Sequence, residues 1–409
     1  MFNEFDSSSY FVDLLALSMV LLPIYLISPW AGAQRILLSL SGAYLLYFIA
    51  PRLLLFYFIF WSLTFLLQRL IVSGEQRKWG AVPFWLSLAL IFFPMVAWKV
   101  IGDDFNILFN LLTHGLLNEI SSRLSVIDYA RDVIIPIGLS FASFRSVDLL
   151  VKSYLGMLPP LSYERVLFFG FFPTVQIVGP IIEYPEIFKA CEKPKRASPE
   201  DIYHGLMRIA LSIIKVFVIA SLLQDSALIF RNYERIDTYK LWLYLFIYAW
   251  FFYINFSGYS DLALGISRLY GYKLKENFNF PFFKENIAEF WNSWHMSLSR
   301  FAQRNIFVPL GGYRAKTQYF ATLATIMVIA MWHDLSRGVV LFGLYHGTGL
   351  ILHRLFSQRY KARHTTNRFF LCGAKMVATH VFVVLSFPLL TLPLESALEF
   401  YLALFGQGL

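Results

Sequence analysis

The run LYLFIYAWFF at residues 243–252 is apolar on every face, and so is the run LLALSMVLLPIYL at residues 14–26. A surface helix of a soluble protein keeps one polar face, and a strand of a membrane β-barrel alternates apolar and polar residues. Neither pattern fits these runs. They are typical of α-helices that cross a lipid bilayer, which need about 20 apolar residues each. The sequence therefore predicts an all-α, polytopic membrane protein.

The composition agrees with this reading over the whole chain. Of 409 residues, 57% are hydrophobic and 15% are charged, whereas a soluble domain has about 25% charged residues. This length suits roughly ten to twelve transmembrane helices in a single membrane-embedded domain over residues 1–409. The apolar runs that suit a span lie near residues 10–28, 36–50, 53–68, 82–98, 133–158, 163–187, 205–228, 240–268, 318–334, 338–356 and 369–394, with a shorter run near 105–118.

The net charge of +9 comes from basic residues that sit in short bursts between the apolar runs. This placement is typical of cytoplasmic loops and argues against nucleic acid as a partner. An even number of spans must separate such bursts, and the apolar runs satisfy that condition. No Lys or Arg precedes Arg35, so the first run lacks the basic start of a cleaved signal peptide and is expected to stay as a helix. The bursts are Arg69-Arg77-Lys78, Lys189-Lys193-Lys195-Arg196 and Arg354-Arg359-Lys361-Arg363-Arg368.

Residues 271–317 break the apolar pattern, because charged and aromatic residues alternate along them. This segment cannot be a span. Aromatic rings mixed with charges suit short interfacial or re-entrant helices at headgroup depth. The count of spans places the segment on the cytoplasmic side. Elsewhere, Arg145, Lys152 and Arg165 lie within or beside apolar runs, which predicts that some helices are broken or tilted.

Three histidines are candidates for chemistry, because an imidazole at membrane depth usually faces a cavity rather than lipid. His295 lies within the interfacial segment, and His333 ends the span near 318–334. His346 lies mid-span between Gly343 and Gly347, where small residues let neighbouring backbones approach. Each histidine alone also fits a hydrogen bond to a carbonyl in a helix bundle; the clustering of all three favours a functional site.

Several other kinds of site find no support in the sequence. His346 and His353 are seven residues apart, which leaves only two possible ligands on one helix face, so no metal is expected. No G-x-S-x-G elbow, Walker loop or G-x-G-x-x-G motif is present. Cys191 and Cys372 lie far apart and give no disulfide or zinc pattern. Asp261 closes an apolar run, which fits either a helix-end carboxylate in water or a residue that lines a cavity.

The chain carries these motifs in order: Pro136-Ile137-Gly138-Leu139-Ser140-Phe141, Phe172-Pro173-Thr174, Gly179-Pro180, Asn255-Phe256-Ser257-Gly258-Tyr259-Ser260-Asp261, Glu276-Asn277-Phe278-Asn279, Trp294-His295, Met331-Trp332-His333 and Leu344-Tyr345-His346-Gly347. Together they resemble the membrane-bound O-acyltransferase family, chiefly in a signature half at about residues 130–350. The bacterial branch with the alginate O-acetylase and the membrane subunit of teichoic acid D-alanylation is the most similar. Two departures bear on acceptor or partner specificity: Gln303-Arg304-Asn305 replaces the usual Arg-Asp-Tyr, and Asp334 replaces the usual Gly.

The resemblance implies a ring of helices around a central tunnel in a bacterial plasma membrane. It also implies transfer of a small acyl group to a hydroxyl of an extracytoplasmic polysaccharide, or to a membrane or periplasmic partner that relays the group. The expected donor is a cytoplasmic thioester, either on a phosphopantetheinyl carrier protein or on coenzyme A, with no bound cofactor. A neutral imidazole has its pKa near the working pH and can take the proton of the attacking hydroxyl.

The resemblance and the count of spans together suggest roles for individual residues. We expect His333, towards the outer end of its span, to be the general base and His295 to line the donor side, although the two could exchange roles. Asn292 and Ser297 are expected to hydrogen-bond the donor arm. The other expected substrate-binding residues are Trp294, Asp334 and His346. A basic cytoplasmic face is expected to dock the donor, chiefly through Lys284, Arg300 and Arg304, with Lys273 and Lys275 beside them.

The nature of the acyl group follows less directly. Residues 276–299 and the short stretch after the 369–394 span resemble the D-alanylating members, whereas Pro309-Leu310-Gly311-Gly312 resembles the acetylating members. D-alanyl transfer is therefore favoured over acetyl transfer, and Asp334 could balance the D-alanyl ammonium. Two rival functions remain open. A transporter or flippase of lipid-linked sugars would use the histidines as proton relays, and a structural scaffold would not need them.

Overall fold

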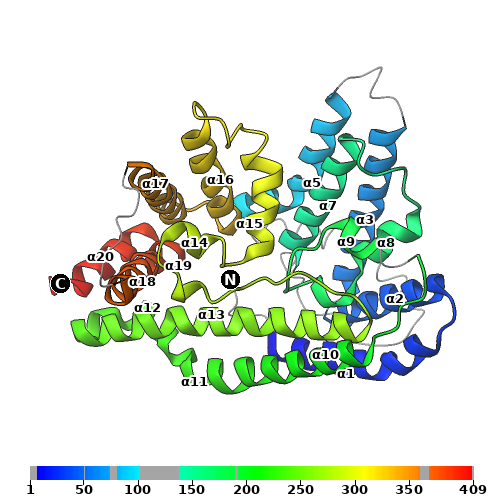
Figure 1. Ribbon diagram of the computed structural model, residues 1–409, viewed down its shortest axis with the longest axis horizontal. Coiled ribbons are helices and arrows are strands. Elements are labelled where there is room, and N and C mark those ends of the chain that lie inside the picture. The colour runs from blue at the N-terminus through cyan, green and yellow to red at the C-terminus, as the bar shows by residue number, and fades with distance from the viewer. Residues whose placement is uncertain are drawn as a thin grey trace. The chain divides into compact units, whose positions relative to one another are not determined.

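The computed structural model describes residues 7–49, 51–73, 81–101, 138–188, 192–359 and 368–407, and in these ranges its regular elements are all helices, without a strand (Figure 1). The expected short run near 105–118 lies outside them, as do Arg77, Lys78, Pro136, Ile137, Lys189, Cys191, Lys361 and Arg363. Seven of the described helices are long and apolar enough to cross a membrane. The prediction of an all-α, multi-pass membrane protein is confirmed.

The chain forms two compact units, and each of the helices α10 and α13 has residues in both units. The first unit comprises residues 1–209 and 261–275. Its helices are α1 (Ser7–Ile27), α2 (Ala31–Ile49), α3 (Pro51–Val72), α5 (Val82–Ile101), α7 (Leu139–Tyr154), α8 (Tyr163–Gly170), the 3-10 turn η1 (Pro173–Val175), α9 (Tyr184–Phe188), most of α10 (Pro199–Ile213) and the end of α13 (Thr238–Leu269).

In this first unit the expected span near 163–187 is wrong. Helix α8 ends at Gly170, and the chain continues through a short turn and an extended stretch, because Pro173 and Pro180 cannot donate the hydrogen bonds of a helix. Carbonyl groups at the end of a buried helix need partners. Arg145 supplies them, since its guanidinium donates to the carbonyls of Phe169 at 2.8 Å and Gly170 at 3.3 Å. The basic residue in an apolar run thus marked a broken helix, as predicted.

Asp261 also departs from expectation in this unit. It lies inside α13, which continues to Leu269, so the reading as a helix-end carboxylate in water is wrong. The carboxylate is buried and accepts a 2.5 Å hydrogen bond from Arg208 on α10. This pair links α10 to α13. Replacing Arg208 would leave the buried carboxylate of Asp261 without that cation, which would be destabilising.

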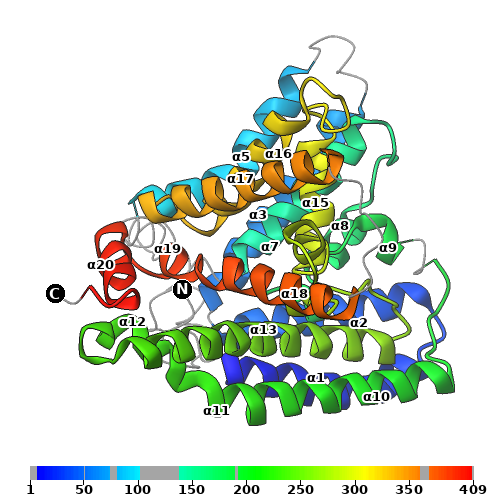
Figure 2. The same cartoon turned by 60° about the vertical axis from the view of Figure 1, so that its left-hand side comes forward.

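The second unit comprises residues 210–260 and 276–409. Its long helices are the first part of α13, α16 (Gln318–His333), α17 (Arg337–Arg359) and α18 (Arg368–Val384), labelled in Figure 2. The shorter elements are η2 (Ile214–Ala220), α11 (Ser221–Leu223), η3 (Gln224–Leu228), α12 (Ile229–Asn232), η4 (Tyr233–Arg235), η5 (Pro281–Phe283), α14 (Ile287–Trp291), α15 (Met296–Ala302), η6 (Gln303–Phe307), α19 (Phe387–Thr391) and α20 (Leu394–Leu404).

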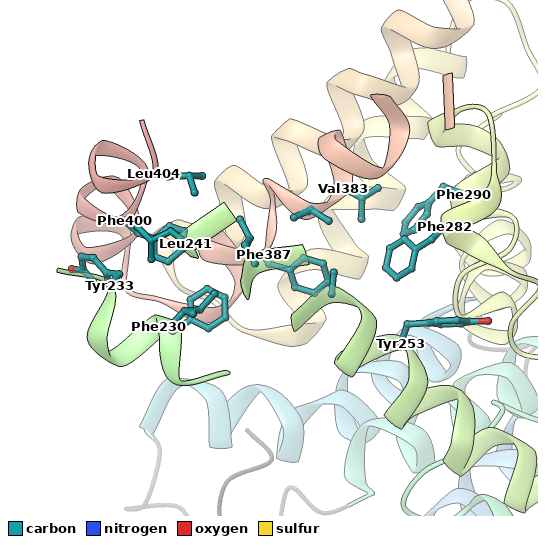
Figure 3. Close-up of a cluster of buried hydrophobic side chains, with 14 of the residues drawn as sticks. Phe230, Tyr233, Leu241, Tyr253, Phe282, Phe290, Val383, Phe387, Phe400 and Leu404 are labelled. Atoms are coloured by element: carbon teal, nitrogen blue, oxygen red, sulfur yellow. The ribbon is translucent and has the colours of Figure 1, made fainter. Parts of the chain in front are cut away.

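Two features hold this unit together. Helices α16 and α17 pack side by side, with Gly343 and Gly347 of α17 at the contact. A Cβ atom at Gly347 would lie 2.6 Å from the side chain of Leu323, so the predicted role of these glycines in close packing is confirmed. Around α13, a buried aromatic cluster draws Phe282 and Phe290 together with Val383 and Phe387 (Figure 3). This cluster anchors the start of the segment that carries His295.

Candidate active site

The segment 271–317 contains only short elements, so it does not form a span, as the sequence predicted. Its longest helical stretch is α15, which continues into the π-helical turn η6. Asn286 caps the start of helix α14, because its side-chain oxygen accepts the backbone N–H of Glu289 at 2.9 Å. Two backbone bonds then join residues 277–279 to 293–296: Met296 donates to Asn277, and Asn279 donates to Ser293. The segment therefore folds back on itself between residues 279 and 293, which places Asn277 beside His295.

The backbone of His295 is held in an uncommon conformation. Its φ of 41° lies in the left-handed region, which residues other than glycine rarely adopt. Such a conformation costs on the order of 1–3 kcal/mol and persists only where the surrounding structure imposes it. The side chain is also buried, with 3% of its surface exposed. Strained, buried residues of this kind gather at functional sites.

The imidazole of His295 contacts a buried polar cluster. Its Nδ1 atom lies 3.1 Å from Oδ1 of Asn277. The same oxygen accepts hydrogen bonds from the backbone N–H of Ser297 at 3.1 Å and from its hydroxyl at 2.8 Å. The amide nitrogen of Asn277 donates to the hydroxyl of Ser260 at 3.1 Å. Residues from three places in the sequence thus fix one edge of the ring.

Aromatic rings surround the rest of His295 and connect it to His333. Phe256 lies edge-on at a centroid distance of 4.9 Å, and Phe278 is stacked at 6.4 Å. Trp332 contacts both histidine rings, with centroids 6.3 Å from His295 and 4.4 Å from His333. The structure therefore brings His295 and His333 to the same indole, that of Trp332.

The electrostatic surroundings keep His295 neutral. Burial lowers the pKa of the His295 imidazole to about 3, and the positive charges of His333 and Arg300 act in the same direction. The ring is therefore uncharged at neutral pH and can accept a proton. His333 is only half-buried at the end of α16. The next residue, Asp334, is exposed, and its carboxylate accepts the backbone N–H of Leu335.

His346 lies in a different environment in the same unit. Its Nδ1 atom is 3.3 Å from the indole nitrogen of Trp291, which can only donate, so Nδ1 accepts that bond. Its Nε2 atom then carries the proton and donates to the hydroxyl of Ser386 at 2.9 Å. Both ring nitrogens are used in tying α14, α17 and the residue before α19 together. The expected role in substrate binding stays a prediction.

The remaining expected substrate-binding residues lie on different sides of the fold-back. Trp294 packs into the aromatic cluster, stacked on Phe252 and Phe290. Asn292 is exposed, whereas Ser297 is buried beside His295. Ser297 therefore belongs to the same polar cluster as the imidazole. A role for Trp294 or Asn292 in holding substrate stays a prediction.

The expected basic face divides into two groups. Lys273 is 3.1 Å from a carboxylate oxygen of Asp201, and Lys275 forms ion pairs with Glu183 and Glu186, so acidic residues neutralise both lysines. Lys284, Arg300 and Arg304 instead belong to the unit that holds His295, and each is partly exposed. Arg300 donates to the backbone carbonyl of Glu276 at 3.2 Å, beside Asn277. In the described part of the chain, no group of three or more His, Cys, Asp or Glu side chains is placed to hold a metal ion.

Comparison with known proteins identifies the family. Residues 93–390 match the model of the membrane-bound O-acyltransferase family, and they include all three histidines. This chain belongs to that family. It is 28% identical to the probable alginate O-acetylase AlgI of Pseudomonas aeruginosa over 71% of this chain and 56% of that one. It is 27% identical to the peptidoglycan O-acetyltransferase of Helicobacter pylori over 60% and 51%, and 29% identical to the teichoic acid D-alanyltransferase of Bacillus subtilis over 55% and 61%.

Membership of the acyltransferase family agrees with the resemblance seen in the sequence, and the matched part covers about half to three fifths of these relatives' lengths. Ser260 and Asn277 lie within the sequence motifs, but the sequence predicts no role for either residue. The available signal was an Asn close to a histidine motif in an aromatic segment. Only the fold shows that these two residues meet His295.

Proposed function

We propose that this chain is a membrane O-acyltransferase, which moves a small acyl group from a cytoplasmic thioester to a hydroxyl outside the cytoplasm. Its acceptor is a cell-surface polysaccharide, or a membrane or periplasmic partner that relays the group. Membership of the family and relatives named for alginate, peptidoglycan and teichoic acid support this proposal. The observation that carries it is the buried, neutral imidazole of His295, which the indole of Trp332 connects to His333.

The chemistry requires a base at the reacting hydroxyl. As the hydroxyl oxygen forms a bond to the thioester carbonyl carbon, the imidazole takes the hydroxyl proton. The C–S bond then breaks, and the same proton passes to the departing thiolate. The sequence favoured His333 as the base and left open an exchange with His295. The geometry supports the exchanged assignment for this step, because the strained backbone and Asn277 hold the ring of His295 in one place. His333, whose ring also contacts Trp332, is then proposed to bind the reacting groups.

The donor is a thioester on a phosphopantetheinyl carrier protein or on coenzyme A. Both are anionic, and Lys284, Arg300 and Arg304 provide positive charge in the unit that holds His295. Ser297 and Asn292 are proposed to contact the donor arm. We favour D-alanyl as the acyl group on the sequence features of residues 276–299, and the exposed carboxylate of Asp334 beside His333 suits its ammonium group. The chain is proposed to act in a bacterial plasma membrane.

The test uses the full chain in liposomes with three labelled donors: D-alanyl carrier protein, acetyl carrier protein and acetyl coenzyme A. Candidate polymers are supplied on the outer side, and mass spectrometry reads the mass added to each polymer. An alanyl ester supports the D-alanyl proposal, and an acetyl ester alone replaces it with acetyl transfer. Movement of lipid-linked sugar without consumption of any thioester would instead show a transporter and overturn the proposal.

A further inference from the structure

We propose that Asn277 is a positioning residue for His295, which holds the imidazole with its proton on Nδ1 so that Nε2 is the nitrogen that accepts a proton. The inference rests on the proposed function and deepens it, because it separates the roles of His295 and His333. It follows from the hydrogen bonds that surround one buried amide group.

The orientation of the Asn277 amide is decided by Ser297. The backbone N–H of Ser297 can only donate, and it points at the Asn277 atom 3.1 Å away. That atom must be the oxygen, because an NH2 group there would place two donors face to face. The nitrogen of the amide then faces the hydroxyl of Ser260, which can accept. Both ends of the amide are satisfied in this orientation alone.

The amide in turn decides the tautomer of His295. The carbonyl oxygen of Asn277 has lone pairs and no proton, so the Nδ1 atom 3.1 Å away must donate to it. A neutral imidazole has one proton, which leaves the lone pair on Nε2. The hydroxyl of Ser297 also donates to Asn277, at 2.8 Å, and is farther from Nδ1, at 3.4 Å. It therefore supports the same arrangement rather than competing with it.

Asn277 holds the backbone as well as the ring. Its carbonyl oxygen accepts the N–H of Met296 at 2.7 Å, directly after the strained His295. The main chain and the side chain of one residue thus bind both sides of the left-handed turn. Asn277 is itself fully buried, so its side chain is not exposed to solvent. This arrangement is what a positioning residue needs, since it removes alternative ring orientations before the substrate binds.

The direct test is the protonation state of His295, measured by 15N NMR of histidine-labelled full-length protein in lipid bilayers. The signal of His295 is the one that disappears in His295→Gln. We expect a protonated Nδ1 and an unprotonated Nε2 in the wild type, and loss of this single state in Asn277→Leu. A proton on Nε2 in the wild type would overturn the inference, whether or not acyl transfer is detected.

The kinetic test compares Asn277→Leu and Asn277→Asp with the matched variants of Asn279, an exposed residue two positions away. We expect Asn277→Leu to lower kcat about 10–100-fold with little change in KM. Asn277→Asp keeps the acceptor and raises the pKa of His295 against the opposing charges of Arg300 and His333, so an acidic limb should move toward neutral pH. Equal losses in both variants with an unshifted pH profile would mean a structural role only. Wild-type kcat in Asn277→Leu, where His295→Ala is inactive, would reject the inference and leave the proposed function standing.

Discussion

Replacement of His295 by alanine separates chemistry from folding in this structure. The variant removes the proposed base, so we expect kcat to fall by about 10²–10⁴-fold. Since each factor of ten corresponds to ~1.4 kcal/mol, the barrier rises by about 3–5 kcal/mol. The donor and acceptor should still bind, because the basic side chains of Arg300 and Arg304 remain in place.

The cost to folding is smaller and can be worked out from the contacts. The ring donates a hydrogen bond to Asn277, and the oxygen of that residue keeps two donors from Ser297 after truncation. Truncation removes that bond and the ring contacts with Phe256, Phe278 and Trp332, at a cost of about 1–3 kcal/mol. Alanine at position 295 keeps the left-handed backbone conformation, so the backbone strain is unchanged. The variant should therefore insert into the membrane and fold.

The assay is initial-rate acyl transfer in liposomes at equal amounts of inserted protein, with thermal unfolding measured on the same samples. His353→Ala is the matched control, because this histidine belongs to the same unit and its side chain interacts with Ser357 on its own helix. His333→Ala is measured in parallel. If His295→Ala keeps more than half of the wild-type rate while His333→Ala is inactive, the assignment of the base to His295 is wrong.

Three further predictions concern stability and donor docking. The pKa of His295 is lowered in the folded protein, so the unfolded chain binds a proton first as the pH falls; the free energy of unfolding is therefore full above about pH 6.5 and decreases toward pH 3. At pH 5 the wild type should lose about 2 kcal/mol more of this free energy than His295→Gln. Equal pH dependence of the two proteins in thermal unfolding would contradict this. Trp291→Phe leaves the buried Nδ1 of His346 without its donor and should cost about 1–3 kcal/mol, with kcat unchanged within threefold; an unchanged unfolding midpoint would show that this bond is unimportant. Charge reversal of Arg300 and Arg304 together should raise KM for the donor more at low salt than at high salt, and a KM increase independent of salt would remove them from the docking face.

The apolar runs predicted the long helices well, because about 20 apolar residues in sequence are a local signal that needs no tertiary information. Helices α3, α13 and α17 lie where the runs near 53–68, 240–268 and 338–356 placed them. The run near 163–187 failed for a physical reason. Its residues are as apolar as those of a span, but two prolines end the helix, and the carbonyls so exposed are satisfied by an arginine from elsewhere.

The candidate site shows the same division between local and long-range information. His295 and His333 were selected by their motifs, and the structure brings them together around Trp332. The partner of His295 was not selected, because the contact with Asn277 depends on a fold-back that joins residues 18 positions apart. A buried hydrogen bond between distant residues leaves no periodic signal in the sequence.

The fold-back also explains why this imidazole lies in a segment of short elements rather than within a span. In a continuous helix, Trp294 and His295 would point about 100° apart around one axis, and both would face neighbouring helices. The left-handed residue at position 295 ends that geometry: Trp294 packs back into the aromatic cluster, and helix α15 begins directly after His295. A base must be held in one orientation, and at this break the constrained backbone of His295 and the hydrogen bond to Asn277 both hold the ring.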